Sequence, residues 1–246
     1  MDNLDITKTT LFVASHSGGK DSQAMLIKLA QVVPVEQIIV VHACLGDVEW
    51  PGARELAQAN ADALGVPFIV ATATKSLLGM VESRFEKRPE VPSWPSSATR
   101  QCTSDLKRGP IEREVRRYAK AHGYDQVVNC MGFRAEESPA RAKRPTFTRV
   151  ARNCTQTREW FDWLPIHDLT TGEVFQAIAD DGQQPHAAYS QGNDRLSCVF
   201  CIMASRNDIR NGAKANPALL ERYIALEEKT GYTMHMSRIP LKELAA

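Results

Sequence analysis

The chain has no long apolar run, no large excess of charge and no cysteine after residue 201. None of its apolar runs approaches the roughly 20 residues of a membrane span, and the start MDNLDITKTT lacks the basic and then apolar pattern of a secretion signal. The formal net charge of +1 gives no general attraction to nucleic acid, so a nucleic-acid surface would have to be a local patch. These absences predict a cytoplasmic protein with no membrane association.

A disulfide framework is also not expected. The six cysteines occur in a chain of 246 residues that shows no secretion signal, so we expect reduced thiols or metal ligands. The sequence has no internal repeat, and 43% of its residues are hydrophobic, which is enough for one substantial core.

The most informative stretch that is present reads VASHSGGKDS. A run of β-forming residues leads into Ser17, Gly18 and Gly19, and Lys20 then opens the amphipathic segment DSQAMLIKLAQ. Glycines allow backbone N–H groups to approach an anion, the start of a helix leaves N–H groups unpaired, and a lysine adds positive charge. The spacing is not that of a P-loop. The stretch predicts a phosphate-binding turn of another nucleotide fold; the alternative is a purely structural Gly-Gly turn.

Short apolar runs alternate with amphipathic stretches along the chain. We expect strands over 10–14, 37–43, 67–71 and 126–131, and helices over 22–32, 52–64 and 110–121. This alternation predicts an α/β fold with a mostly parallel sheet, helices on both faces, and ligands beyond the carboxyl ends of the strands. Within 72–104, the Pro- and Ser-rich segment PEVPSWPSSATRQC is expected to be a loop. We expect an α/β nucleotide-binding domain over 1–170 and a small helical C-terminal extension over 171–246.

Two levels of resemblance follow from these motifs. SGGKDS resembles the PP-loop of the ATP pyrophosphatase superfamily, whose members have a Rossmann-like adenine nucleotide α-hydrolase fold. The segments RQCTSDLKRGPIER, MGFRAEESPAR, WLPIHDLTTGEVFQAI and RLSCVFCIMASRND occur in an order similar to that of the phosphoadenylyl sulfate reductase family, over about residues 10 to 235. The resemblance implies ATP as a cofactor together with Mg²⁺.

The resemblance and the positions at strand ends indicate the site residues. Lys20, Asp21, Ser22 and Arg134 are the expected catalytic residues, since Arg134 follows the fourth expected strand and arginine pairs well with phosphate oxygens. Glu136 and Glu137 would orient these cations or hold Mg²⁺ through water. For any one of these charges, a surface ion pair is the alternative. The complete set expected to bind nucleotide is Ser15, Ser17, Gly18, Gly19, Lys20, Asp21, Ser22, His42, Asp47, Lys107 and Arg134.

The pair Cys198 and Cys201 has the spacing of two ligands to one metal. In adenylyl sulfate reductases and thiolating relatives, which the chain resembles, such a pair joins a paired-cysteine site to carry a [4Fe-4S] cluster. Here Gln101 replaces the first cysteine of that site, so the resemblance implies Cys102, Cys198 and Cys201 as three ligands. Zinc and free thiols are the alternatives. The other three cysteines, Cys44, Cys130 and Cys154, are expected to be inert thiols.

A local basic patch follows the fourth expected strand. It contains six cations with no acidic residue between 138 and 158, and it could therefore neutralise several phosphates. A solvated loop and a clamp on the nucleotide itself are the alternatives. The patch consists of Arg141, Lys143, Arg144, Arg149 and Arg152, followed by Arg158.

The sulfonucleotide reductases that the chain resembles attack sulfur with a cysteine near the C-terminus, and residues 202–246 contain none. We therefore expect an ATP pyrophosphatase that adenylylates a substrate for sulfur insertion into DNA or RNA. The chain also resembles subunits of bacterial DNA phosphorothioation systems, and this resemblance implies a cysteine desulfurase as the sulfur donor. A homodimer is a further expectation. The alternatives are a thiol-dependent reductase that forms sulfite and a non-catalytic, nucleotide-binding scaffold for a desulfurase.

Overall fold

The computed structural model describes residues 6–246, and these fold into two compact units, each assembled from separate parts of the chain. Unit 1 comprises Met1–Ala43, Gly52–Ala71 and Ile111–His186, and unit 2 comprises Cys44–Pro51, Thr72–Pro110 and Ala187–Ala246. The expected lack of a secretion signal concerns in part residues 1–5, which lie outside the described residues. Over residues 6–246, no helix is both long and apolar enough to cross a membrane.

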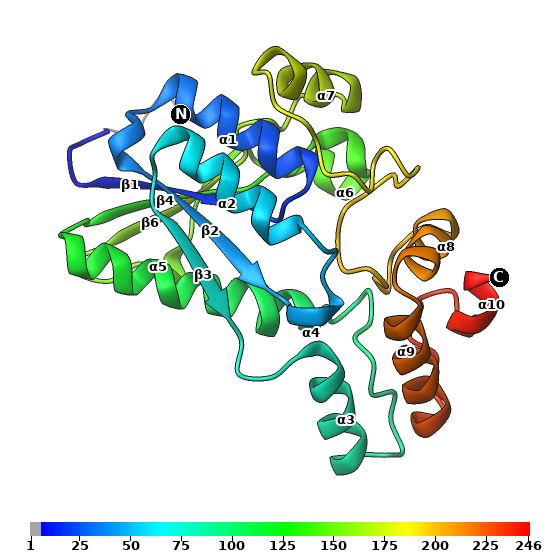
Figure 1. Ribbon diagram of the computed structural model, residues 1–246. Helices are drawn as coiled ribbons and strands as arrows, with labels where there is room; N and C mark the ends of the chain where they lie inside the picture. Colours follow the sequence, from blue (N-terminus) through cyan, green and yellow to red (C-terminus); the bar gives the residue numbers. More distant parts are fainter. Residues whose placement is uncertain (1–5) are drawn as a thin grey trace. The chain divides into compact units, whose positions relative to one another are not determined.

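Unit 1 contains a six-stranded sheet in the order β3-β2-β1-β4-β6-β5 (Figure 1). The β1 strand is parallel to β2 and β4, β4 is parallel to β6, and only β5 is paired antiparallel, with β6. Because β1 lies between β2 and β4, the connections leave β1 in opposite directions, which is where doubly wound sheets bind ligands. The strands are β1 (Thr10–Ser15), β2 (Ile38–Cys44), β3 (Phe68–Thr72), β4 (Gln126–Cys130), β5 (Phe147–Arg149) and β6 (Glu159–Trp163).

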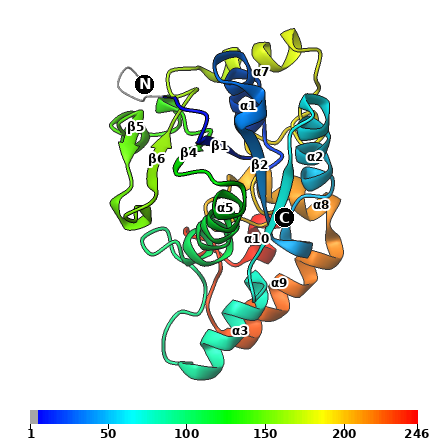
Figure 2. The ribbon, with the colours of Figure 1, turned by 90° about the vertical axis from the view of Figure 1, so that its left-hand side faces the viewer.

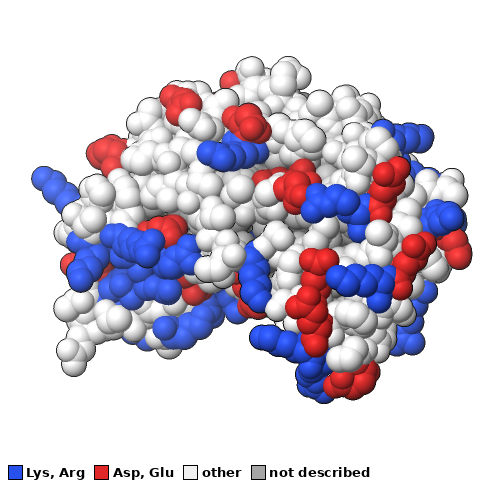
Figure 3. Space-filling model, turned by 60° about the horizontal axis from the view of Figure 1, so that its bottom comes forward, with Lys and Arg blue, Asp and Glu red and all other residues white. Residues whose placement is uncertain are grey.

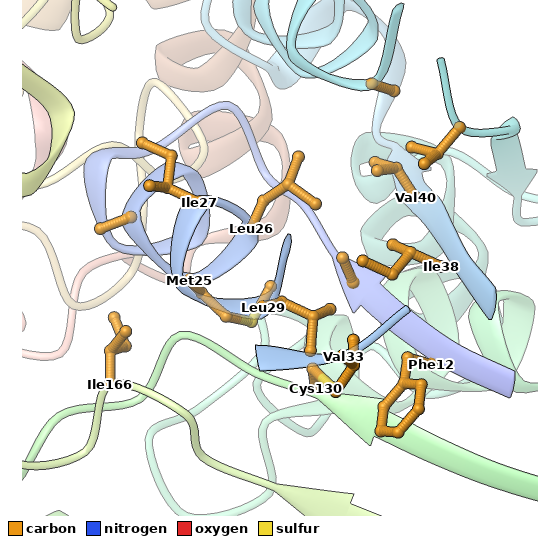
Figure 4. Packing of buried hydrophobic residues seen from close by; sticks show 14 of the residues in the cluster. Phe12, Met25, Leu26, Ile27, Leu29, Val33, Ile38, Val40, Cys130 and Ile166 are labelled. Atoms are coloured by element: carbon orange, nitrogen blue, oxygen red, sulfur yellow. The ribbon is translucent and has the colours of Figure 1, made fainter. Parts of the chain in front are cut away.

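Helices cover both faces of this sheet (Figure 2). Alternate residues of a strand point to opposite faces, so Phe12 and Ala14 of β1 pack with α1 while Leu11 and Val13 pack with α5. Figure 4 shows Met25 and other α1 side chains against the first of these faces. The helices of unit 1 are α1 (Lys20–Val32), α2 (Ala53–Leu64), α5 (Gly109–His122), α6 (Pro139–Ala142) and α7 (Thr171–Asp180), with short turns η1 (Val35–Gln37), η4 (Ala135–Glu137) and η5 (Ala151–Asn153).

The expected fold class, a mostly parallel sheet with helices on both faces, is confirmed, and the four expected strands match β1 to β4 within one residue at either end. The sequence analysis missed β5 and β6. It also did not predict helix α3 (Leu77–Lys87), which lies before the expected loop PEVPSWPSSATRQC. The Ser76 side chain accepts a hydrogen bond from the Gly79 N–H and caps this helix, and Leu77, Leu78 and Val81 are buried.

Unit 2 is helical. Trp94 stacks on Tyr223 at 5.6 Å between ring centroids, and Phe200 meets Tyr223 edge-on at 5.2 Å, which joins three distant segments in one core. The carboxylate of Glu227 accepts hydrogen bonds from the backbone N–H groups of Met234 and Leu241, which holds the C-terminal segment in place. The elements are η2 (Gly46–Val48), α3 (Leu77–Lys87), α4 (Gln101–Thr103), a π-helical turn η3 (Ser104–Arg108), α8 (Arg206–Ala215), α9 (Pro217–Thr230) and α10 (Leu241–Ala245).

Candidate functional site

The glycine turn connects the carboxyl end of β1 to the first turn of α1. Gly18 has a φ of +74°, and a Cβ at this position would lie 2.4 Å from the carbonyl oxygen of Ala53, at the start of α2. Glycine is therefore required twice here, for the left-handed backbone and for the close contact. The turn ends at Gly19, which directly precedes α1, so the glycines lead into a helix N-terminus, the kind of backbone that favours an anion.

The side chains of His16 and Ser22 stabilise the glycine turn through hydrogen bonds to its backbone. The His16 Nδ1 atom accepts a hydrogen bond of 3.0 Å from the Gly18 N–H, so this nitrogen carries no proton. Burial, reinforced by the neighbouring His42, lowers the pKa of His16 to about 3, which keeps the ring neutral. The Ser22 hydroxyl donates to the Gly19 carbonyl at 2.8 Å and accepts from the Ser17 N–H at 3.1 Å. Ser22 thus positions the loop, while the sequence analysis had assigned it a direct role on phosphate.

A second loop, after β4, lies against the start of α1. A Cβ on Gly132 would come within 2.7 Å of the Asp21 carbonyl oxygen and 3.0 Å of the Ser22 nitrogen. This close approach brings Arg134, two residues further on, beside the glycine turn. The two loops leave adjacent parallel strands, β1 and β4, at the point where the sheet connections diverge.

Lys20, Asp21 and Arg134 form one ionic network there. Asp21 accepts from the Lys20 ammonium at 3.0 Å through Oδ2 and from the Arg134 Nε at 2.6 Å through Oδ1. Lys20 and Arg134 are each 3% exposed. Arg134 also donates to Glu136 at 2.6 Å and to Thr171 at 3.1 Å; burial opposes its charge, but the carboxylates of Asp21, Glu136 and Glu137 raise its pKa overall. The Arg134 guanidinium therefore stays protonated in a buried site.

The remaining nucleotide-binding candidates of unit 1 surround this network. The Ser15 hydroxyl, at the end of β1, donates to Asn129 of β4 at 3.1 Å. His42 is fully buried on β2, and its Nδ1–H donates to the His16 carbonyl at 2.9 Å. Both side chains thus support the loop through hydrogen bonds within the protein.

Two other candidates, Asp47 and Lys107, belong to unit 2. Asp47 forms an ion pair with Arg222 of α9. Lys107 lies on the π-helical turn η3, near Glu49 and the three candidate thiols. Burial acts to lower the pKa of Lys107, but Cys198, Cys201, Cys102 and Glu49 raise it overall.

The three candidate metal ligands gather around this lysine within unit 2. Burial raises the pKa of Cys198 to about 11, although Lys107 acts in the opposite direction, and burial likewise raises the pKa of Cys102. The strand-like contact between Cys198 and Glu49 and the hydrogen bond from the Val199 N–H to the Val48 carbonyl fix the first half of the Cys-x-x-Cys turn. Cys102 and Cys198 are thus thiols rather than thiolates at neutral pH.

These thiols do not form a ligand set for the cluster that the resemblance implies. Over residues 6–246, no three His, Cys, Asp or Glu side chains are grouped so that they could hold a metal ion. The [4Fe-4S] cluster therefore stays a prediction, and no chemical step is assigned to it. Among the other cysteines, Cys130 is fully buried in the core, as expected of an inert thiol, and Cys44 and Cys154 are partly exposed.

The predicted nucleic-acid patch is largely neutralised by acids from outside the segment. Arg149 forms a bidentate pair with Glu159 at 2.6 and 2.9 Å, and Arg152 pairs with Glu112 at 2.7 Å. Arg141 pairs with Glu137 and lies over the ring of Phe133, as does Arg144. Lys143 is exposed. The sequence showed no acid within the patch, but the fold supplies three.

Sequence analysis missed several residues that shape the site. His16 stood inside the quoted loop and could have been noticed as the acceptor that the turn needs. Gly132 stood in the segment MGFR, but only its close approach to Asp21 reveals its function. The Lys20 ammonium lies 6.0 Å from the ring centroid of Phe175 on α7, and no pattern in the sequence indicated this contact.

Comparison with known proteins gives one curated relative and several similar folds. The relative is an uncharacterized 37.8 kDa protein in the gpa 5′ region of Escherichia phage 186, 33% identical over 116 residues, which are 47% of this chain and 34% of the phage protein. The aligned part of the chain thus spans about a third of that relative.

Three solved structures have weakly similar folds. Phosphoadenylyl-sulfate reductase from Candida auris is 13% identical (78% of this chain, 82% of that one, TM-score 0.49). Yeast FAD synthetase is 11% identical (80% and 58%, TM-score 0.48), and the U34-tRNA thiolase of Methanococcus maripaludis, solved with its [4Fe-4S] cluster, is 14% identical (94% and 71%, TM-score 0.44).

The sheet order and the turn after β1 define the class: a doubly wound α/β protein with a PP-loop-type nucleotide fold. The family profile described as the phosphoadenosine phosphosulfate reductase domain matches residues 11–204, most of the chain. The protein therefore belongs to the phosphoadenosine phosphosulfate reductase domain family.

Proposed function

We propose that this protein is an ATP pyrophosphatase that adenylylates an acceptor, so that AMP becomes the leaving group for a sulfur nucleophile. The observation that supports this most is the network of Lys20, Asp21 and Arg134 beneath the glycine turn. Lys20 and Arg134 are buried cations at the helix start, held there by the carboxylates of Asp21 and Glu136, so both lie where a polyphosphate would bind.

In the proposed step, an acceptor oxygen attacks the α-phosphorus of MgATP, and the bond from that phosphorus to the bridging oxygen of the β-phosphate breaks. The turn N–H groups and the two cations stabilise the charge that develops on the departing pyrophosphate. Asp21 acts as a positioning residue, because its two oxygens hold Lys20 and Arg134 in place. The Mg²⁺ arrives with the nucleotide as part of the substrate.

The acceptor in this proposal is a nucleic acid, DNA by preference, as in phosphorothioation, and the sulfur donor is a cysteine desulfurase that works with this chain. Membership of a family described by a sulfonucleotide reductase supports sulfur chemistry in general. The same membership favours a second candidate, the thiol-dependent reduction of a sulfonucleotide to sulfite.

The test measures products. With MgATP and acceptor, the protein should form AMP and pyrophosphate, and Lys20→Ala should reduce the rate by about 10²- to 10³-fold, the usual cost of removing a transition-state charge contact. The matched control is Lys28→Ala, which changes an exposed lysine further along the same helix and should leave the rate unchanged. Formation of ADP would contradict the proposal. Release of sulfite from phosphoadenylyl sulfate with a thiol would establish the reductase instead.

A further inference from the structure

Unit 1 carries a basic pocket that the proposed ATP chemistry does not use. It has a volume of about 440 Å³ and is lined by Arg113, Arg116, Arg117, Lys120 and Arg158, with no carboxylate among its lining residues. Tyr124 and Thr157 complete the lining. Lys and Arg side chains gather at the left of the face shown in Figure 3, the same side on which Figure 1 shows α5. Of the six cations of the patch described above, only Arg158 lines this pocket.

Four of these cations form a row along α5. Positions 113, 116, 117 and 120 have the spacing i, i+3, i+4 and i+7, so they occupy one face of the helix. Seven residues of α-helix advance by about 10 Å. One strand of DNA places a phosphate about every 3.4 Å along the axis, so the row extends as far as about three successive phosphates.

The helix keeps an excess of positive charge after its internal pairs are formed. Glu114 pairs with both Arg113, at 2.8 Å, and Arg117, at 3.1 Å, and Glu112 lies 3.7 Å from Arg116, so two carboxylates of the helix serve three guanidinium groups and Lys120 adds a further charge. Arg158 donates from Nε and Nη2 to the Asn153 carbonyl, which orients its side chain without cancelling its charge. An anion is therefore the ligand that this surface favours.

The pocket lies at the amino ends of the parallel strands, and the PP-loop lies at their carboxyl ends. Tyr124 precedes β4 and Arg158 precedes β6, and both of these parallel strands begin at the same edge. The PP-loop follows the carboxyl end of β1, which is parallel to β4. A strand of five residues spans about 17 Å, so one mononucleotide cannot reach both places, whereas a polymer can.

We propose that this pocket binds the sugar-phosphate backbone of a nucleic acid, with Arg117 and Lys120 on phosphates and Tyr124 available to stack on a sugar or base. This deepens the proposed function, because it places a docking surface for the acceptor on this chain. Binding itself requires no ATP turnover, so the two proposals fail separately. Contacts of this kind are independent of sequence and strongly dependent on salt.

The test measures the affinity of the full-length protein for a random-sequence DNA duplex of about 30 base pairs at several salt concentrations. The double variant Arg117→Gln/Lys120→Gln should weaken binding by roughly tenfold per lost contact near 0.1 M salt, and should reduce the slope of log K against log salt by about 2. The swap Arg117→Lys/Lys120→Arg preserves both charges and should keep the wild-type slope.

The matched control is Arg88→Gln/Lys28→Gln. It removes the same charge, and Arg88 pairs with Glu90 at 3.0 Å as Arg117 pairs with Glu114, but neither residue lines the pocket. The control should bind like the wild type, and Lys20→Ala should bind the duplex while its AMP formation is lost. The proposal is overturned if the wild type binds no duplex, or if the pocket variant and the control are equally affected, which would indicate general charge effects or a protein partner for this face.

Discussion

Each unit of this protein contains one lysine in a chemically specialised setting, and the two settings differ. In unit 1, Lys20 is buried in a network of formal charges, with Asp21 between it and Arg134. In unit 2, Lys107 is partly exposed and lies near the Glu49 carboxylate and three thiols. The first lysine forms an ion pair with a carboxylate within a network of formal charges, while the second is accompanied mainly by sulfur groups.

The difference shows what each setting can do. A fixed ionic network costs no reorganisation when a charged ligand arrives, so it suits the stabilisation of phosphate groups. The thiol group around Lys107 changes its charge with pH and oxidation, so it suits chemistry at sulfur. The family to which the chain belongs combines the two kinds of chemistry in its description.

The largest expected effect is on the ionic network. The change Asp21→Asn leaves two buried cations without their shared carboxylate, and we expect the free energy of unfolding to fall by about 3–5 kcal/mol. Urea denaturation measures this. In contrast, Glu90→Gln in the exposed Arg88–Glu90 pair of unit 2 should cost less than about 1 kcal/mol. Equal effects of the two changes would show that the network contributes no more than a surface pair.

The second expected effect is a pH dependence that belongs to unit 1. His16 has a pKa of about 3 when folded and 6.5 when unfolded, so the unfolded chain binds more protons between these values. Stability should therefore fall as the pH drops from 6.5 towards 3, by on the order of 4 kcal/mol from this residue. The variant His16→Asn keeps a side-chain acceptor but cannot titrate, and its stability curve should be flatter over this range. If the free energy of unfolding of His16→Asn depends on pH as steeply as that of the wild type, His16 does not cause the pH dependence.

A smaller effect should separate the tight turn of unit 1 from an open turn of unit 2. Gly18 and Gly231 have almost the same φ, +74° and +72°, but only Gly18 has backbone atoms where a Cβ would be placed. Gly231→Ala should cost about 1 kcal/mol for the left-handed backbone alone. Gly18→Ala should cost a further 1–3 kcal/mol, because the Ala53 backbone would have to move. Thermal unfolding of both variants measures the two losses of stability. Equal losses would show that the start of α2 moves away from the added Cβ at little cost in free energy.

The last expected effect changes a reaction rate rather than stability, and it concerns the thiol of Cys198 in unit 2. Since the pKa of Cys198 is about 11, against an ordinary value of 9.0, its alkylation near pH 8 should be roughly 100-fold slower than its intrinsic reactivity predicts. Lys107→Met removes a charge that lowers this pKa, so the rate should fall further. Peptide mapping after timed alkylation measures this, and faster alkylation of Cys198 in Lys107→Met would show that the lysine shields the thiol.

Iron analysis addresses the predicted cluster separately. Thiolate-ligated iron–sulfur clusters require Cys102, Cys198 and Cys201 to come together as deprotonated ligands, which the described structure does not show. Protein purified without oxygen should contain iron in proportion to protein if that prediction holds, and the iron should be lost in Cys198→Ala. Colourless protein with three alkylatable thiols would instead support the free-thiol alternative.

The local sequence pattern predicted those strands that are buried on both of their faces. The strands β1 to β4 are short apolar runs, because parallel strands covered on both faces must be apolar throughout. The strand β6, EWFDW, was missed because its charged residues obscure this pattern: Trp160 is buried, while Asp162 accepts a hydrogen bond from Asn129 of β4. Helix α3 was missed because the Pro- and Ser-rich stretch that follows it dominates the composition of 72–104.

The sequence by itself determined the glycine turn, its lysine and the α/β alternation, since these depend on residue type and local spacing. The tertiary structure alone decided which charges meet. Arg134 reaches Asp21 across 113 positions because β4 pairs with β1, and the cations of the predicted patch find acids that lie outside it in sequence. Sheet order and helix packing bring such residues together, and neither can be read from the neighbours of a residue along the chain. The basic row on α5 is intermediate, because its helical spacing is visible in the sequence but its pocket with Arg158 exists only in the fold.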